Sequence, residues 1–301
     1  MYSDITVVKC HYEQCQPGAQ TKMKTLLLDA GNSRLKWAFS EQGQLSRQGA
    51  LSYQWLTLDA QLEAELGSLV SVEWPLAGVV LCNVAGERLE AAVQTMLSIQ
   101  DGKHRSHDRV QERASLTIKK IVAQPVAFGV RCAYEQPAQL GADRWAALVA
   151  ARHHCDGVSC VIDCGTALTL DVLTAEGRHA GGMIIPGMEM MLASLVENTH
   201  GILASKRPEL SPFAVRNTAD AVQAGIIAAM RGSVQQMLQD CRDELGVEPI
   251  CVLTGGNANW LRPGLPDTVM LEPDWVLKGL AIIADENRVS SIGTRHTGNH
   301  V

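Results

Sequence analysis

The sequence predicts an α/β protein made of two similar halves that face a shared cleft. The deciding observation is an internal echo, in which residues 28–33 (LDAGNS) recur as residues 162–166 (IDCGT). Each copy is an apolar strand, then Asp-x-Gly, then a hydroxyl residue and a second apolar strand. The length of 301 residues leaves room for two ordinary domains, and the 46% of hydrophobic residues can fill two cores. We therefore expect a duplicated domain, with the change of domain near His154.

Four parts of the chain follow from this division. Residues 1–22 are polar and mixed and precede a second methionine, so we expect an extension outside the fold. Residues 23–154 and 155–285 are the two predicted domains, and residues 286–301 form a polar tail that we expect to fray. The first residues have no apolar signal-peptide core, and no apolar run reaches the roughly 18–20 residues of a membrane-spanning helix. The expectation is a cytoplasmic protein with no membrane partner.

The charge of the chain excludes one broad class of function. The formal net charge is −6 and the pI is near 5.8. General nucleic-acid binding needs a basic face, so we expect no nucleic-acid partner. A nucleotide remains compatible, because an anion site can be built locally from backbone N–H groups and a few cations.

Nine cysteines are present, an odd number without a regular framework. Several stand in apolar runs, among them Cys82 and Cys251, so we interpret them as reduced thiols. A metal site is also not favoured where His and Cys gather along the chain, because CxxC and HxxxH spacings are missing. The residues concerned are His153, His154, Cys155, Cys160 and Cys164.

Strand and helix patterns alternate along both halves. Strands are expected at residues 24–29, 35–39, 76–84, 118–122, 158–163, 166–173 and 249–254. Helices are expected at residues 87–97, at 140–153, from Pro186 onward, from Thr218 as N-cap toward 245, and at 275–284. Residues 100–114 are polar and predict a solvated loop. The helix after Pro186 carries an apolar face that favours a core or an interface, made of Met188, Met190, Met191, Leu192, Leu195 and Val196.

The first candidate site is the loop at residues 29–36 (DAGNSRLK). A glycine after a strand lets the backbone approach a ligand, and the N–H groups of such a turn can hold phosphate oxygens. Ser33 adds a hydroxyl and Lys36 a cation, and Asp29 could hold hydrated Mg²⁺. An ordinary hairpin turn has a similar composition, so this loop alone does not decide between the two interpretations.

The second loop, residues 163–166, strengthens the phosphate interpretation. Two such loops, each ending a strand of its own domain, can hold one polyphosphate from both sides. Gly255 and Gly256 follow another predicted strand, and a nucleotide base could lie over that flat backbone. Neither a GxxxxGK[ST] loop nor a GxGxxG motif is present, so the sequence does not predict a P-loop or a Rossmann site.

The third candidate site is residues 141–145 (GADRW) at a helix entry. Asp143 and Arg144 are neighbours, so they point in different directions from the helix. Asp143 could accept a proton from a hydroxyl that attacks a phosphate, and Arg144 could bind a carboxylate. The alternative is a surface ion pair or a plain helix-terminal charge.

The ordered set of motifs resembles the type III pantothenate kinases. The resemblance runs from about residue 23 to about residue 284, and Ser33 stands where the family usually has threonine. It includes Tyr134 and the segments at 29–38 (DAGNSRLKWA), 140–145 (LGADRW), 161–171 (VIDCGTALTLD), 181–191 (GGMIIPGMEMM), 217–226 (NTADAVQAGI) and 253–258 (LTGGNA). It implies the fold of acetate and sugar kinases, Hsp70 and actin, in which two ribonuclease-H-like domains flank a nucleotide cleft.

The resemblance also implies an activity and its cofactors. The family phosphorylates pantothenate to 4'-phosphopantothenate with ATP, in the first step of coenzyme A biosynthesis. We therefore expect Mg²⁺ with ATP, a monovalent cation such as K⁺ or NH₄⁺, and a homodimer.

Residue by residue, the resemblance assigns three sets of contacts. The expected ATP-binding residues are Asp29, Ala30, Gly31, Asn32, Ser33, Arg34, Leu35, Lys36 and Thr166. The expected pantothenate-binding residues are Tyr134, Gly141, Ala142, Asp143, Arg144 and, from the partner subunit, Thr218. Asp143 is expected to be the proton acceptor, and Asp163 to bind the monovalent cation.

Three alternatives stay open. The same fold could phosphorylate another small hydroxy acid. The family also includes a regulatory homologue, Bvg accessory factor, although a pure regulator need not keep Asp29, Asp143, Arg144, Asp163 and Thr166. A chaperone-like member of the wider superfamily is disfavoured, because the chain is short and lacks a peptide-binding domain.

Overall fold

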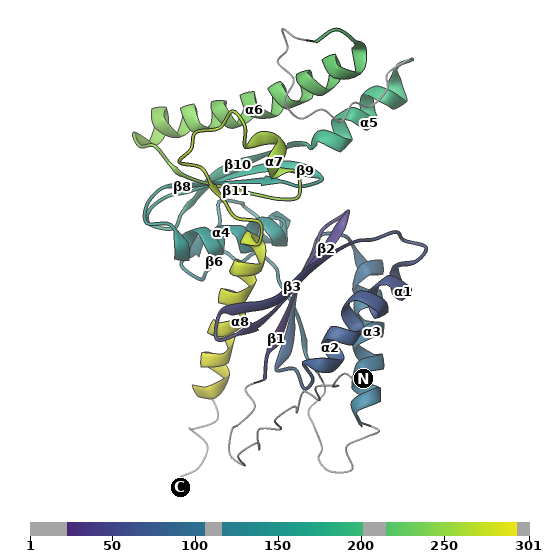
Figure 1. Cartoon of the computed structure of the whole chain (residues 1–301). Helices are drawn as coiled ribbons and strands as arrows, with labels where there is room; N and C mark the ends of the chain where they lie inside the picture. The colour runs from purple at the N-terminus through teal and green to yellow at the C-terminus, as the bar shows by residue number, and fades with distance from the viewer. Residues whose placement is uncertain (1–22, 106–115, 201–214, 294–301) are drawn as a thin grey trace, which may run out of the picture.

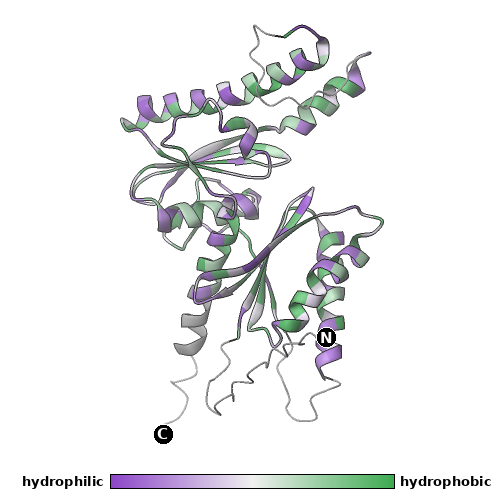
Figure 2. Cartoon of the chain, viewed as in Figure 1, coloured by the Kyte–Doolittle hydropathy of each residue, from purple (hydrophilic) through white to green (hydrophobic). Residues whose placement is uncertain are grey.

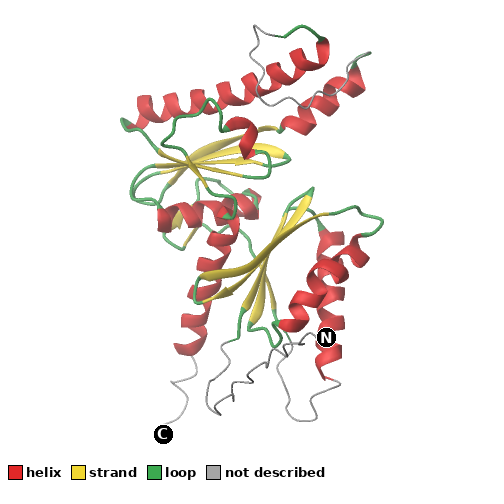
Figure 3. Cartoon of the chain, in the orientation of Figure 1, coloured by secondary structure: helices red, strands yellow, loops and turns green. Residues whose placement is uncertain are grey.

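Two five-stranded sheets dominate the computed structural model, which describes residues 23–105, 116–200 and 215–293 (Figures 1 and 3). The first sheet has the order β3-β2-β1-β4-β5, and the second the order β10-β9-β8-β11-β12. The strands of the first sheet are β1 (Thr25–Ala30), β2 (Arg34–Glu41), β3 (Gln44–Ser52), β4 (Gly78–Asn83) and β5 (Ile118–Lys120). The second contains β8 (Ser159–Cys164), β9 (Ala167–Leu173), β10 (His179–Pro186), β11 (Ile250–Thr254) and β12 (Met270–Leu271).

The two sheets share one topology. The opening strand of each, β1 or β8, pairs antiparallel with the next strand and parallel with a later one, β4 or β11. The internal echo of the sequence therefore reflects a structural duplication, and the predicted fold class is confirmed. A small ribbon of β6 (Val126–Ala127) and β7 (Val130–Arg131) lies outside both sheets.

Helices cover the outer faces of both sheets and fill the space between them (Figure 1). The helices of the first half are α1 (Leu58–Leu62), η1 (Glu63–Gly67), α2 (Ser68–Val72), α3 (Glu87–Arg105), η2 (Pro137–Gln139) and α4 (Ala142–His154). Those of the second half are α5 (Met188–Asn198), α6 (Thr218–Leu245), α7 (Ala258–Leu261) and α8 (Trp275–Gly293). None of the described helices is long and apolar enough to cross a membrane.

The alternation of side chains along each central strand sorts the cores. Leu26 and Leu28 of β1 pack with α1 and α3, whereas Leu27 between them faces the layer that contains α4 and α8. In β8, Cys160 and Ile162 pack against α6. The outer helices accordingly show hydrophobic and hydrophilic stripes (Figure 2).

Helices α4 and α8 form a middle layer that joins the two sheets. Their core includes residues of both sheets, and Trp275 Nε1 donates a hydrogen bond to the Ala147 carbonyl at 3.1 Å. A Cβ atom on Gly279 would lie 1.9 Å from the Ala146 carbonyl oxygen, so the helices touch backbone to backbone there. α8 also contacts strands of the first sheet, so the division at residues 154/155 stays a prediction.

Two helix starts differ from the sequence-based expectation. Pro186 closes strand β10, and α5 begins at Met188 after the N-cap Gly187. The N-cap of α6 is Asn217, whose side chain accepts from the Asp220 N–H at 2.9 Å, so Thr218 is the first helical residue. Both errors have one cause: Pro and Thr suit a helix start, but their neighbours make the decisive contacts.

The expected solvated loop and polar tail were also partly wrong. α3 continues to Arg105, because Gln100 is buried and donates to Glu63 Oε1 at 2.8 Å. The rest of that expected loop lies largely outside the described residues. α8 continues to Gly293, so residues 286–293 are helical. The expected extension at residues 1–22 and the last residues, 294–301, lie outside the described residues.

Candidate functional site

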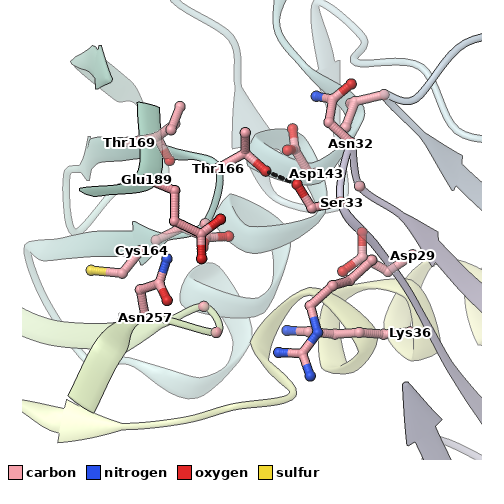
Figure 4. Close-up of a pocket in the computed structure, with 18 of the residues that line it drawn as sticks. Asp29, Asn32, Ser33, Lys36, Asp143, Cys164, Thr166, Thr169, Glu189 and Asn257 are labelled. Carbon is pink, nitrogen blue, oxygen red and sulfur yellow. Dashed lines mark hydrogen bonds between the residues drawn. The ribbon is translucent and has the colours of Figure 1, made fainter. Parts of the chain in front are cut away.

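Two equivalent turns meet between the sheets. The turn between β1 and β2 is closed by a hydrogen bond from the Gly31 N–H to the Arg34 carbonyl at 3.0 Å. The turn between β8 and β9 is closed from the Gly165 N–H to the Ala167 carbonyl, also at 3.0 Å. Ser33 Oγ and Thr166 Oγ1 form a hydrogen bond of 2.9 Å across the gap (Figure 4). The predicted juxtaposition of the two loops is therefore confirmed.

A cavity of about 450 Å³ opens at this meeting point, a size typical of ligand sites. Most of the predicted site residues line it: Asp29, Gly31, Asn32, Ser33, Arg34, Lys36, Asp143, Asp163 and Thr166. Ala30 and Leu35 do not, because their side chains are fully buried in the core of the first sheet. Thr169, Glu189 and Asn257 line the cavity although sequence reasoning assigned them no role.

Three carboxylates give this cavity an acidic floor. Burial raises the pKa of Asp29 to about 7, partly offset by Lys36 and reinforced by Asp143 and Asp163. Burial likewise raises the pKa of Asp163 to about 6 and raises the pKa of Asp143 above its ordinary value. Carboxylates with such shifted pKa values in a cleft mark functional sites. The arrangement suits a bound cation, because a cation would offset the cost of burying negative charge.

Lys36 supplies positive charge beside Asp29. It pairs with Asp29 in the register of β1 and β2, and its Nζ donates to the Pro273 carbonyl at 3.1 Å. Figure 4 shows Asp29 and Lys36 on one side of the cavity, and Thr166, Glu189 and Asn257 on the other. The lining cations Arg34 and Lys36 thus come from the first half of the chain, whereas the lining acids come from both halves.

Arg144 is held at the base of α4, behind Asp143. Its Nε and Nη2 donate to the two carboxylate oxygens of Asp171 at 2.8 and 2.6 Å, and its Nη1 donates to the Tyr134 hydroxyl at 2.8 Å. The predicted neighbours Tyr134, Asp143 and Arg144 therefore lie together. Arg144 is buried, which excludes a surface ion pair as its role.

A family model described as type III pantothenate kinase matches residues 25–240 of this chain. The chain belongs to the type III pantothenate kinase family. A kinase of that name from Azoarcus is 36% identical, over 91% of this chain and 95% of its own length. Another, from Nitrosococcus oceani, is 33% identical over 87% of this chain and 94% of its own length.

A solved structure supports the fold. It is a Campylobacter jejuni protein assigned to the Baf family of transcriptional activators, 20% identical, with a TM-score of 0.54. The similarity covers 88% of this chain and 99% of the other. At that identity it says nothing about the activity of this chain.

The remaining residues that the type III pantothenate kinase motifs predict lie at helix starts. Gly141 is the N-cap of α4, and Ala142 is the first residue of that helix, next to Asp143. Thr218 is exposed at the start of α6 and is not among the residues that line the cavity. Of the residues predicted to bind the substrate, Asp143 lines the cavity, whereas Tyr134, Gly141, Ala142 and Arg144, like Thr218, are not among the lining residues.

Sequence reasoning missed several side chains that support this kinase-family site. The Tyr53 hydroxyl donates to the Gly31 carbonyl at 2.6 Å and so fixes the first turn. Asp171 is an acid inside an otherwise apolar strand, a signal that could have drawn attention to it. Among the described residues, no group of three or more His, Cys, Asp or Glu side chains is arranged to hold a metal by itself, so a cation here would need ligands from phosphate and water.

The raised carboxylate pKa values predict how stability depends on pH. Folding raises the pKa of Asp29 from 3.8 to about 7, so the folded state binds this proton more tightly than the unfolded state does. Binding of the proton therefore stabilises the fold at low pH, and this stabilisation is lost as the pH rises through that range. The ligand-free protein should therefore have a lower midpoint of urea unfolding at pH 8 than at pH 5.

The Asp29→Asn variant provides the control for this pH dependence. It should show a smaller fall in the urea midpoint between pH 5 and pH 8, since the amide does not titrate. An equal fall in both proteins would contradict the role of Asp29.

Proposed function

We propose that this chain transfers the γ-phosphoryl group of ATP to the primary hydroxyl of pantothenate and forms 4'-phosphopantothenate. The observation that carries the proposal is the cavity in which Asp143 faces two phosphate-type turns from the two halves of the chain. The family membership names the reaction class, and the paired turns supply a place for a polyphosphate.

The proposed mechanism is direct in-line transfer. Asp143 orients the substrate hydroxyl and accepts its proton, and its raised pKa brings it closer to the neutral range in which a base works best. The backbone N–H groups of the two turns, with Ser33, Thr166 and Lys36, hold the phosphates and offset the charge of the transferring group. The substrate carboxylate binds Arg144.

Cations fit the acidic floor of the cavity. Asp29 and Asp163 offer carboxylate oxygens, which are the ligands that Mg²⁺ and other hard cations prefer. We assign Asp29 to Mg²⁺ that enters with ATP, and Asp163 to a monovalent cation, K⁺ or NH₄⁺. Mg²⁺ supplies charge neutralisation of the phosphates. The raised pKa values of both acids support this assignment, because a cation would keep them ionised.

The nucleoside part of ATP has a place beside the phosphates. A second cavity of about 440 Å³ shares Arg34, Lys36, Gly255 and Gly256 with the first and reaches Leu271 and Pro273. A base lying there would rest on the backbone of Gly255 and Gly256. A nucleoside there would lie next to the part of the first cavity that Arg34, Lys36, Gly255 and Gly256 line, and Asp143 does not line this second cavity.

A homodimer completes the proposal. Three apolar residues of α5, Met190, Leu195 and Val196, are 48%, 37% and 42% exposed, so α5 has apolar surface that the described chain does not cover. α5 packs on α6, and the exposed Thr218 begins α6. A second copy on this surface would bring the partner's Thr218 toward the pantothenate site. We place the reaction in the cytoplasm, as the first step of coenzyme A synthesis.

The test measures ADP release from Mg-ATP with and without pantothenate, and with and without K⁺ or NH₄⁺. We expect release that needs both pantothenate and the monovalent cation. Release with another hydroxy acid of a substrate panel, but not with pantothenate, would reassign the substrate. Folded, ATP-binding protein that releases no ADP with any of them would favour a regulatory role.

A further inference from the structure

A chain of four polar side chains, three of them buried and Tyr134 half-buried, lies behind the proposed base. Tyr134, Arg144, Asp171 and His179 are connected in that order by hydrogen bonds. His179 Nε2 lies 2.9 Å from Asp171 Oδ1, and the Asp171 and His179 side chains are 4% and 0% exposed. The rings of Tyr134 and His179 are stacked at 6.1 Å, so the ends of the chain also touch.

The acceptor in this hydrogen-bonded series, Asp171, determines which nitrogen of His179 carries a proton. An ionised carboxylate only accepts hydrogen bonds, so Nε2 of His179 carries a proton that it donates to Asp171. Asp171 then receives three hydrogen bonds, two from Arg144 and one from His179. Nδ1 of His179 is buried without a hydrogen-bond partner among the described residues. The contacts of this ring are therefore directed to Asp171 and Tyr134.

A β-bulge places His179 on the face of Asp171. In β9 and β10, His179 is paired with Leu173 and Gly182 with Asp171, with an irregularity between His179 and Gly181. Three residue steps in β10 thus match two steps in β9, and both His179 and Gly182 share a face with Asp171. Without the extra residue, one of the two would point to the opposite face of the sheet. Bulges commonly redirect a side chain beside a site.

Gly182 leaves room for the ion pair. A Cβ atom at this position would lie 2.4 Å from Asp171 Oδ1 and 2.8 Å from Arg144 Nη2. The strand therefore needs glycine where Asp171 and Arg144 meet. The bulge thus serves the contact of His179 with Asp171, and the glycine serves the contact of Asp171 with Arg144.

The hydrogen bonds leave part of Arg144 available. A guanidinium carries five N–H groups, and three are used in the bonds to Asp171 and Tyr134. Two remain, one on Nη1 and one on Nη2, with no partner among the described residues. One N–H of Nη1 and one of Nη2 are the donors with which a guanidinium can bind a carboxylate through two parallel hydrogen bonds.

Stability alone is a weak reason for this network. A buried ion pair often contributes no more to folding than apolar side chains of the same volume would. A role in setting the direction of Arg144 accounts for the buried acid, the redirected histidine and the glycine together.

We propose that Asp171 and His179 are positioning residues that orient Arg144 toward the substrate carboxylate and so select acid substrates over their uncharged analogues. This inference rests on the proposed function, because it assigns Arg144 to the carboxylate of pantothenate. Asp171 holds one edge of the guanidinium, His179 holds Asp171, and the two remaining N–H groups then face the substrate.

The experiment compares pantothenate with pantothenyl alcohol, in which a hydroxymethyl group replaces the carboxylate. In Asp171→Asn, kcat/KM for pantothenate should fall roughly 10- to 100-fold, mainly through KM, since hydrogen bonds to charged groups are lost. For the alcohol, kcat/KM should change less than about threefold, as should KM for ATP, because neither substrate presents a carboxylate to Arg144. Asp267→Asn on the exposed surface is the matched control and should leave both ratios unchanged.

A second pair of variants covers the case in which Asp171→Asn fails to fold. His179→Phe keeps a flat ring but removes the donor to Asp171, so selectivity for the acid should fall. His179→Gln restores a donor and should recover most of that selectivity.

Two results would overturn the proposal. Equal losses for pantothenate and the alcohol, together with a lower unfolding midpoint, would make the network purely structural. Unchanged or improved kcat/KM for pantothenate in the variants would show that Asp171 competes with the substrate. If wild-type protein phosphorylates neither compound, the proposed function fails and this inference fails with it. If the wild type is active, the variants test the positioning role separately from the proposed function.

Discussion

Replacing Asp143 with Asn should lower kcat by about 10²- to 10⁴-fold, the usual contribution of a general base. The amide keeps the size of the side chain and can still accept from the Arg144 N–H, which now donates to Asp143 Oδ1 at 2.7 Å. What it loses is the ability to take the proton of the attacking hydroxyl. Steady-state kinetics with pantothenate and calorimetric titration with ATP would measure the two effects separately.

ATP affinity should stay close to that of the wild type, because the two turns that hold the phosphates are untouched. Asp156→Asn, an exposed acid just beyond the same helix, is the matched control and should keep wild-type kcat. Near-native turnover of Asp143→Asn would show that another group accepts the proton.

Gly279→Ala should have the largest effect on stability. The added methyl would sit 1.9 Å from the Ala146 carbonyl oxygen and 2.6 Å from its carbon, and both are backbone atoms that cannot rotate away. Overpacking of this kind costs about 1–3 kcal/mol or more, against a helix-propensity gain of about 1 kcal/mol. We expect a net loss, seen as a lower midpoint of urea unfolding.

Activity should fall in the same variant, because α4 carries Asp143 and Arg144 and would be displaced from α8. Gly232→Ala is the matched control, since a methyl on this α6 glycine would meet nothing within 4 Å. It should raise stability slightly through helix propensity. A neutral Gly279→Ala would mean that the two helices separate at little cost.

The turns that build the site were predictable because they are local. Asp-x-Gly with a following hydroxyl residue marks both of them, and strands that start two copies of one domain must end at equivalent places. Ser33 and Thr166 could therefore be paired from the sequence, and the structure joins them by a hydrogen bond. The resemblance assigns the whole segment 29–36 to ATP and does not separate side chains from backbone, so it includes Leu35, whose side chain lies in the core.

The support behind the site depends on contacts between distant segments. Asp171 and His179 matter because Asp171 pairs with Arg144 and a bulge in β10 brings His179 to Asp171, and no local pattern records a bulge. Pro186 shows the opposite failure, since a residue that suits a helix start closes a strand here. In each case, pairing between strands overrode local preference.

Formation of 4'-phosphopantothenate is the most direct evidence for the proposed reaction. Purified protein would be incubated with Mg-ATP, K⁺ and pantothenate, and the products would be separated and identified by mass spectrometry. The Asp143→Asn variant would be assayed in parallel. We predict 4'-phosphopantothenate and ADP in equal amounts from the wild type, and at most a trace from the variant. ADP without a phosphorylated pantothenate, or equal product from both proteins, would contradict the assignment.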